Sequence, residues 1–150
     1  MLNWDQLYKN LVRVSDKHGK LAAIFGAFAK LVEAQVNEPT FHIKGITTSL
    51  HLAQSYFTTT FAGRTILFLF TSLLESNGTL KGNLQCYLMK ECPDPLHVKL
   101  GEFNFSGSGQ TNLKMPDDGD EIIITIDVAA LYVFLHFIHE SLSPKEDNGK

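Results

Sequence analysis

The chain has 150 residues, of which 44% are hydrophobic and 19% charged, and its formal net charge is −3. This composition is ordinary for a globular domain and far from that of a disordered chain. Because the charge is negative and basic residues form no long run, a nucleic-acid binder that depends on neutralising phosphates is not expected. Two cysteines are too few for a disulfide scaffold and the chain begins with no leader-like segment, so we expect a cytoplasmic protein.

Two apolar segments need testing as membrane spans, residues 21–36 and residues 122–138. The first contains Lys30 and Glu33, and the second contains Asp127 and His136. Both fall short of the ~20 uninterrupted apolar residues that a span needs, so no membrane association is expected.

The first 36 residues have the pattern of a helix. Asn3 and Gln6 form a capping-box-like start. Large side chains then follow in a strict alternation of three and four: Trp4, Leu7, Leu11, Val14, His18, Leu21, Phe25, Phe28, Val32 and Gln35. Gly19 is placed like a helix-ending glycine, so the choice is between two helices joined there and one helix of about 50 Å, and we favour a bend or break at Gly19. A coiled-coil dimer has the right spacing but too few flanking charges.

Strands are expected through the middle of the chain. Residues 41–47 predict a short edge strand, residues 48–54 fit either a helical turn or a continued strand, and residues 56–61 are strongly β-prone. Ala62-Gly63 is typical of a tight turn. After a rigid exit loop with two prolines, residues 96–105 predict a strand with a bulge at Gly101.

The central prediction is a long β-hairpin, residues 64–90, closed by Asn77-Gly78 as a two-residue type I′ turn. That turn would place Ser76 opposite Thr79 and so fix the register. One face, predicted to be the core face, would then carry Leu67, Leu69, Leu84, Cys86 and Leu88. The opposite face would carry Ile66, Phe68, Phe70, Tyr87 and Met89.

Residues 106–121 are expected to be the longest loop, with SGSG at residues 106–109 and an acidic cluster at Asp117, Asp118, Asp120 and Glu121. A strand at residues 122–126 and a helix capped by Asp127 follow, and Pro144 stops that helix. The fold class is therefore α+β, a mostly antiparallel sheet of about five or six strands with both terminal helices on one face. We expect one domain, with a helical region at 1–38, the sheet at 40–126, the C-terminal helix at 127–143 and a tail at 144–150.

The C-terminal helix carries the best candidate for chemistry, because Tyr132, His136 and His139 share one helix face. Two histidines one turn apart can chelate zinc, but catalytic sites usually add a third protein ligand. We therefore favour packing or surface roles for these histidines, and we expect no cofactor.

Three weaker patterns have structural interpretations that we favour. Cys86, Cys92 and His97 lack the spacing of a metal cluster or a nucleophile pair. The SGSG segment lacks the lysine and the following helix of a P-loop, so a plain linker is favoured over a phosphate site. The acidic loop lacks the calcium-loop pattern. Catalytic-triad and dinucleotide motifs are absent from the sequence.

The favoured hypothesis is a small, non-enzymatic protein-binding module, such as an inhibitor, immunity-type or adaptor protein. It would bind a protein partner, or a second copy of itself, through the apolar sheet face formed by Ile66, Phe68, Phe70, Tyr87 and Met89. The alternative is a small-molecule binder or metal-dependent hydrolase, with a pocket between the sheet and the C-terminal helix and with His136 and His139 as working groups.

Overall fold

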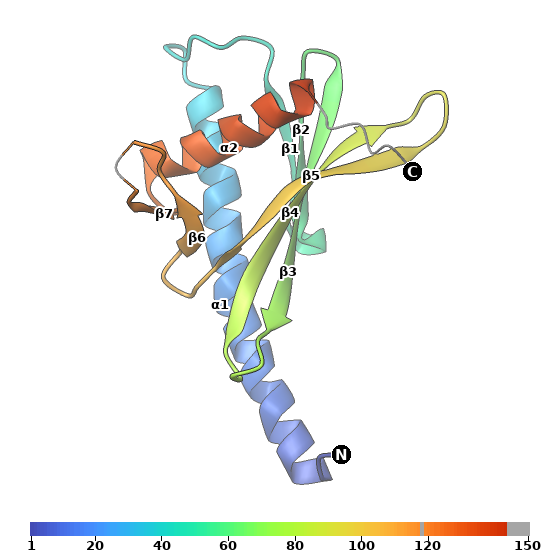
Figure 1. The fold of residues 1–150 in the computed structure, drawn as a ribbon, viewed down its shortest axis with the longest axis vertical. Coiled ribbons are helices and arrows are strands. Elements are labelled where there is room, and N and C mark those ends of the chain that lie inside the picture. The colour runs from blue at the N-terminus through green and yellow to red at the C-terminus, as the bar shows by residue number, and fades with distance from the viewer. Residues whose placement is uncertain (118, 144–150) are drawn as a thin grey trace.

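The computed structural model describes residues 1–117 and 119–143. Within these residues, two helices accompany a seven-stranded antiparallel sheet whose strands follow in chain order (Figure 1). The elements are α1 (Trp4–Val36), β1 (Thr47–His51), the 3-10 turn η1 (Leu52–Gln54), β2 (Tyr56–Phe61), β3 (Arg64–Leu74), β4 (Leu80–Lys90), β5 (Leu96–Phe105), β6 (Gln110–Lys114), β7 (Glu121–Ile123) and α2 (Asp127–Leu142). The predicted α+β class is confirmed, with seven strands instead of five or six. Asp118 and the predicted tail, residues 144–150, lie outside the described residues.

The N-terminal region forms one continuous helix, so the predicted break at Gly19 is wrong. Its start is the predicted capping box, in which the Asn3 side chain accepts from the Gln6 amide at 2.9 Å. Residues on either side of Gly19 are held by the rest of the fold: His18 Nδ1 lies 2.6 Å from Ser72 Oγ, and Leu21 is buried in the core. These tertiary contacts outweigh the modest helix-breaking tendency of one glycine, about 1 kcal/mol.

The β3–β4 hairpin has a three-residue loop, so the predicted two-residue turn is wrong. The Glu75 amide donates to the Thr79 carbonyl at 2.8 Å, and the Gly78 amide donates to the Glu75 carbonyl at 2.9 Å. Gly78 takes a positive φ of 84°, as a type I turn closed by a glycine bulge requires. One extra loop residue shifts the register by one position, and a shift of one moves each side chain of one strand to the other face.

The observed register pairs Ile66 with Leu88, Phe68 with Cys86 and Phe70 with Leu84. These six side chains of the two strands therefore share a single face. Leu67 and Leu69, which were predicted to be core residues, instead lie opposite Tyr87 and Gln85 on the other face.

Elsewhere the element boundaries differ from the sequence predictions at four places. The last strand, β7, is Glu121–Ile123, whereas the predicted strand was residues 122–126. The predicted strand at residues 41–47 is a loop as far as residue 46, and β1 begins only at Thr47. In this loop Gly45 has a φ of 85° and the Lys44 ammonium donates to the Phe41 carbonyl. Strand β6 lies inside the predicted long loop. At the start of α2, Ile126 is the N-cap and Asp127 is the first helical residue. The negative charge of the Asp127 carboxylate interacts favourably there with the positive end of the helix dipole.

Two other predictions are confirmed. Ala62 and Gly63 both have positive φ, 53° and 76°, and close the β2–β3 hairpin. The bulge in β5 is present: Cys86 pairs with Gly101 and Tyr87 with Lys99, which leaves the intervening residue of β5 without a partner.

Both helices pack against one face of the sheet. The ring of Phe57 in β2 lies 5.8 Å from Phe25 of α1 and 6.4 Å from Phe134 of α2, and 4.6 Å from Phe68 of β3. The sheet residues buried on this face include Phe57, Thr59, Ile66, Phe68, Phe70, Leu80, Leu84, Cys86, Leu88, Phe103, Phe105 and Thr111. No helix covers the opposite face in Figure 1. Because burial of each large apolar side chain is worth about 1.5–3 kcal/mol, this aromatic layer is the main source of stability.

A glycine makes room for part of this layer. Gly82 pairs with Phe105, whose ring lies over it, and a Cβ at position 82 would stand 2.2 Å from Phe105 Cζ. The aromatic ring therefore fills the place that a side chain would otherwise take in β4.

Candidate functional site

The five residues predicted to form an apolar binding face do not lie together. Ile66 and Phe68 are fully buried and Phe70 is 2% exposed, all three in the core beneath the helices. Tyr87 and Met89 are partly buried on the opposite, uncovered face. The register shift is the physical cause, and it removes the aromatic patch on which the predicted site rested.

The uncovered sheet face is mixed in character. Leu67, Leu69, Tyr87 and Met89 lie among threonines and hydrogen-bonded polar side chains. The side-chain amide of Asn83 donates to the carboxylate of Glu102 at 3.1 Å and to Asn104 Oδ1 at 2.8 Å. Hydrogen bonds from Lys99 and from Asn83 lower the pKa of the Glu102 carboxyl from its ordinary value. This face therefore combines hydrogen-bonded polar side chains with a strip of half-buried apolar side chains.

A more apolar surface lies on the first part of α1, which extends beyond the sheet in Figure 1. We refer to residues 4–13 as the helical arm. Three large side chains of its 3-4 alternation face solvent, Trp4 at 74%, Leu7 at 41% and Leu11 at 58% exposure. Tyr8, one turn after Trp4, is exposed beside them, with the two rings 6.3 Å apart.

The sheet reaches the helix no further than the tip of the β3–β4 hairpin. There His18 approaches Ser72 and stacks on Phe70 at 5.4 Å. At this tip Leu73 and Leu74 are also exposed, at 48% and 58%. The helical arm lies beyond these contacts with the hairpin tip. Its row of apolar side chains is therefore not covered by any of the described residues.

The exposed part of α1 is also basic. Lys9, Arg13 and Lys17 follow one another at intervals of four and so share one helix face, and Lys20 follows one turn later. Residues 4–20 hold four basic and two acidic side chains, although the whole chain is negatively charged. An apolar row thus lies on the same segment as a basic face.

The histidines of α2 do not form a metal site with other described residues. His136 and His139 are both exposed, and His136 Nε2 lies 3.9 Å from the carboxylate of Glu140. No cluster of three His, Cys, Asp or Glu side chains suited to a metal ion occurs in the described ranges. The cavity between the sheet and this helix, which includes Tyr132 and His136, holds about 150 Å³.

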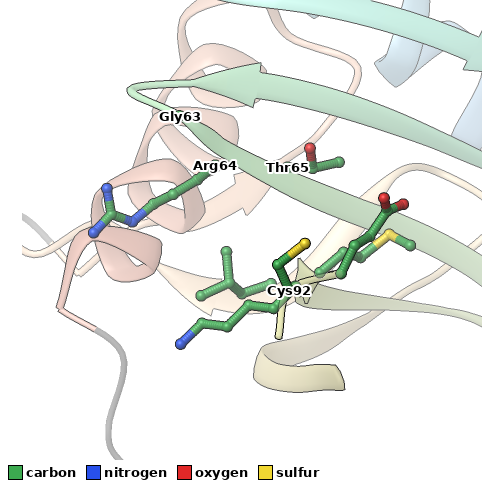
Figure 2. Close-up of a pocket in the computed structure, with 8 residues that line it drawn as sticks. Gly63, Arg64, Thr65 and Cys92 are labelled. Carbon is green, nitrogen blue, oxygen red and sulfur yellow. The ribbon is translucent and has the colours of Figure 1, made fainter. Parts of the chain in front are cut away.

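The two cysteines have different surroundings. Cys86 lies in the core, where burial raises the pKa of its thiol well above the ordinary value, so it stays neutral. Cys92 is exposed at the edge of an open cleft of about 580 Å³ that Gly63, Arg64 and Thr65 also line (Figure 2). The Arg64 side chain points away from Cys92, and its Nε donates to the Ser141 carbonyl at 3.1 Å.

Of the described helices, none is long and apolar enough to cross a membrane. Comparison with known proteins found no match: no family model, no curated protein and no solved structure matches this chain.

Proposed function

We propose that this chain is a small, non-enzymatic protein-binding module and that the helical arm is its contact surface. The observation that carries the proposal is the exposed row of Trp4, Leu7 and Leu11 on a stretch of α1 with no sheet beneath it. Large apolar side chains that gather on one exposed face are typical of interaction sites.

The spacing of the row suits one mode of recognition. Helices that bind in a groove present anchors at positions i, i+3, i+4 and i+7, and Trp4, Leu7, Tyr8 and Leu11 have these intervals. Trp and Tyr are also the residues most often found to dominate binding energy. The arm is already helical, since the capping box holds its first turn, so little ordering entropy is lost on binding.

The positive charge of the helical arm indicates that its partner is acidic. Lys9 and Arg13 of the arm, with Lys17 next in the series, favour a groove whose rim carries carboxylates. Two copies paired through their arms would bring like charges together, so an acidic protein is favoured over a second copy. The proposal includes a cytoplasmic location, which the exposed free thiol of Cys92 supports, because reducing compartments keep such thiols unpaired.

The test is a pull-down from source-cell lysate with three immobilised proteins. The first is the wild type, and the second carries Leu7→Ser and Leu11→Ser on the arm. The third, the matched control, carries Tyr87→Ser and Met89→Ser on the uncovered sheet face. We expect the wild type and the control to retain the same acidic protein and the arm variant to lose it.

The captured protein is then purified and titrated by calorimetry. Loss of two anchors at about 1.5–2 kcal/mol each predicts at least ~100-fold weaker binding by the arm variant. If the arm variant still binds the partner and the sheet-face variant does not, the binding site lies on the uncovered sheet face and not on the helical arm. A wild-type dimer in gel filtration that dissociates only in the arm variant would replace the acidic partner with a second copy.

A further inference from the structure

A second surface feature is independent of the helical arm. A cavity of about 220 Å³ lies between α1, the start of β4 and the loop that joins β5 to β6. Its lining residues are Lys17, Lys20, Leu21, Thr79, Leu80, Lys81, Ser106 and Gly107. Three of these eight are lysines and none is acidic, in a chain whose net charge is −3.

Buried neighbours hold the lysines at the cavity. Lys20 directly precedes Leu21, which is 2% exposed in the core, and Lys81 directly follows Leu80, which is 7% exposed. Lys17 lies one turn before Leu21 on the same helix. The backbone positions of the three cationic side chains are therefore fixed by core packing.

The three ammonium groups differ in how far they are already neutralised. Lys81 Nζ lies 3.1 Å from a carboxylate oxygen of Glu75, in the hairpin loop. Lys17 and Lys20 form no ion pair with any residue that the structure describes. Two unpaired cations thus face the cavity beside one that is paired.

The SGSG segment forms the opposite wall. The Ser106 hydroxyl contacts the Ser108 hydroxyl at 2.8 Å, and the Ser106 carbonyl accepts from the Gly109 amide at 2.9 Å. A Cβ built at Gly107 would have no heavy atom within 4 Å, so the backbone is open to solvent there. The segment alone is weak evidence for an anion site. The lysines that α1 and β4 bring to it are the second observation.

We infer that this cavity binds a small ligand that carries a phosphate group. Lysine ammonium groups and hydroxyl donors such as those of Thr79 and Ser106 are suited to phosphate oxygens. Leu21 and Leu80 form part of the cavity lining, and the aliphatic stems of Lys17 and Lys20 add apolar contact for an organic part. At ~30 Å³ per water the cavity has room for roughly seven waters, and it is smaller than the usual pockets for drug-sized ligands, which favours a small phosphate monoester.

The experiment is a titration of the ¹⁵N-labelled full chain with phenyl phosphate, with inorganic phosphate and phenol in separate arms. We expect saturable shifts of the amides of residues 17–21, 79–81 and 106–107 that fit one dissociation constant. Phenyl phosphate should bind at least ~10-fold more tightly than inorganic phosphate, and phenol should leave these amides unchanged. Equal affinity for the two phosphates would overturn the assignment of an organic ligand.

Two variants test the site without disturbing the core. Lys17→Ala with Lys20→Ala should weaken phenyl phosphate binding at least ~10-fold. Gly107→Asp, which places a carboxylate in open space, should weaken it similarly. The matched control, Lys30→Ala with Lys90→Ala, removes two exposed lysines outside the cavity and should leave the affinity unchanged. Equal weakening in the control, or shifts that do not saturate, would show general attraction of anions and overturn the inference.

Discussion

The two halves of α1 carry the same spacing of large apolar side chains in different surroundings. In the second half Leu21, Phe25 and Phe28 are no more than 2% exposed, because the sheet lies beneath them. In the first half Trp4, Leu7 and Leu11 continue the row into solvent. Spacing therefore determines which side of a helix is apolar, whereas the reach of the sheet determines how much of that side this chain itself covers.

The largest expected difference between the halves is in stability. Phe28→Ala should lower the free energy of unfolding by about 3–5 kcal/mol, because it leaves a cavity among packed aromatic rings. Leu11→Ala on the arm should change it by no more than ~0.5 kcal/mol. Urea denaturation of both variants measures this contrast. A comparable loss for Leu11→Ala would mean that the arm is packed on something in the free protein.

The boundary between the halves should show an intermediate effect. His18→Ala removes the contact with Ser72 and the stacking on Phe70, and the expected loss in the free energy of unfolding is about 1–2 kcal/mol. Lys9→Ala, nine residues before His18 in the helical arm, is the control and should leave the free energy of unfolding unchanged. If both variants unfold at the wild-type urea midpoint, His18 does not anchor the helix to the hairpin tip.

The sequence predicted most of the helices and strands, but it did not predict which side chains the fold buries. The capping box of Asn3 and Gln6, the strands of the central hairpin and the α+β class follow from local patterns. The register did not, because a glycine with positive φ at position 78 serves a two-residue and a three-residue loop equally well. The one extra residue in the loop therefore decides whether Phe68 and Phe70 are core or surface residues.

Of the two proposed sites, only the SGSG wall of the cavity was visible as a local pattern, and the sequence alone favoured a linker there. The 3-4 alternation of the arm continues that of the buried half, so the sequence gives no sign that the sheet stops near Ser72. The lysine cavity joins residues 17–21, 79–81 and 106–107, which lie far apart in the chain. β6 was missed because its residues, QTNLK, are mostly polar, and only Thr111 among them is buried.

A smaller effect of opposite sign is expected where the halves join. A Cβ at Gly19 would meet no heavy atom within 4 Å, and Gly19 lies inside the continuous helix. Gly19→Ala should therefore raise the free energy of unfolding by about 0.5–1 kcal/mol, through higher helix propensity alone. Thermal and urea unfolding would both detect it. Destabilisation would indicate that the helix is bent or open at Gly19 in solution, as the sequence first suggested.

The smallest effect on global stability is expected at the helix start. Asn3→Ala removes the cap bond to the Gln6 amide, and the arm should fray because no sheet supports it. A local loss of about 1 kcal/mol corresponds to roughly fivefold faster amide hydrogen exchange in residues 4–13. The urea midpoint of the whole chain should stay unchanged, since the core begins beyond the arm. Asn3→Asp keeps a capping oxygen and should keep the wild-type exchange rates. If Asn3→Ala lowered the global midpoint instead, the two halves of α1 would unfold as one unit, and the arm would be part of the stabilising structure.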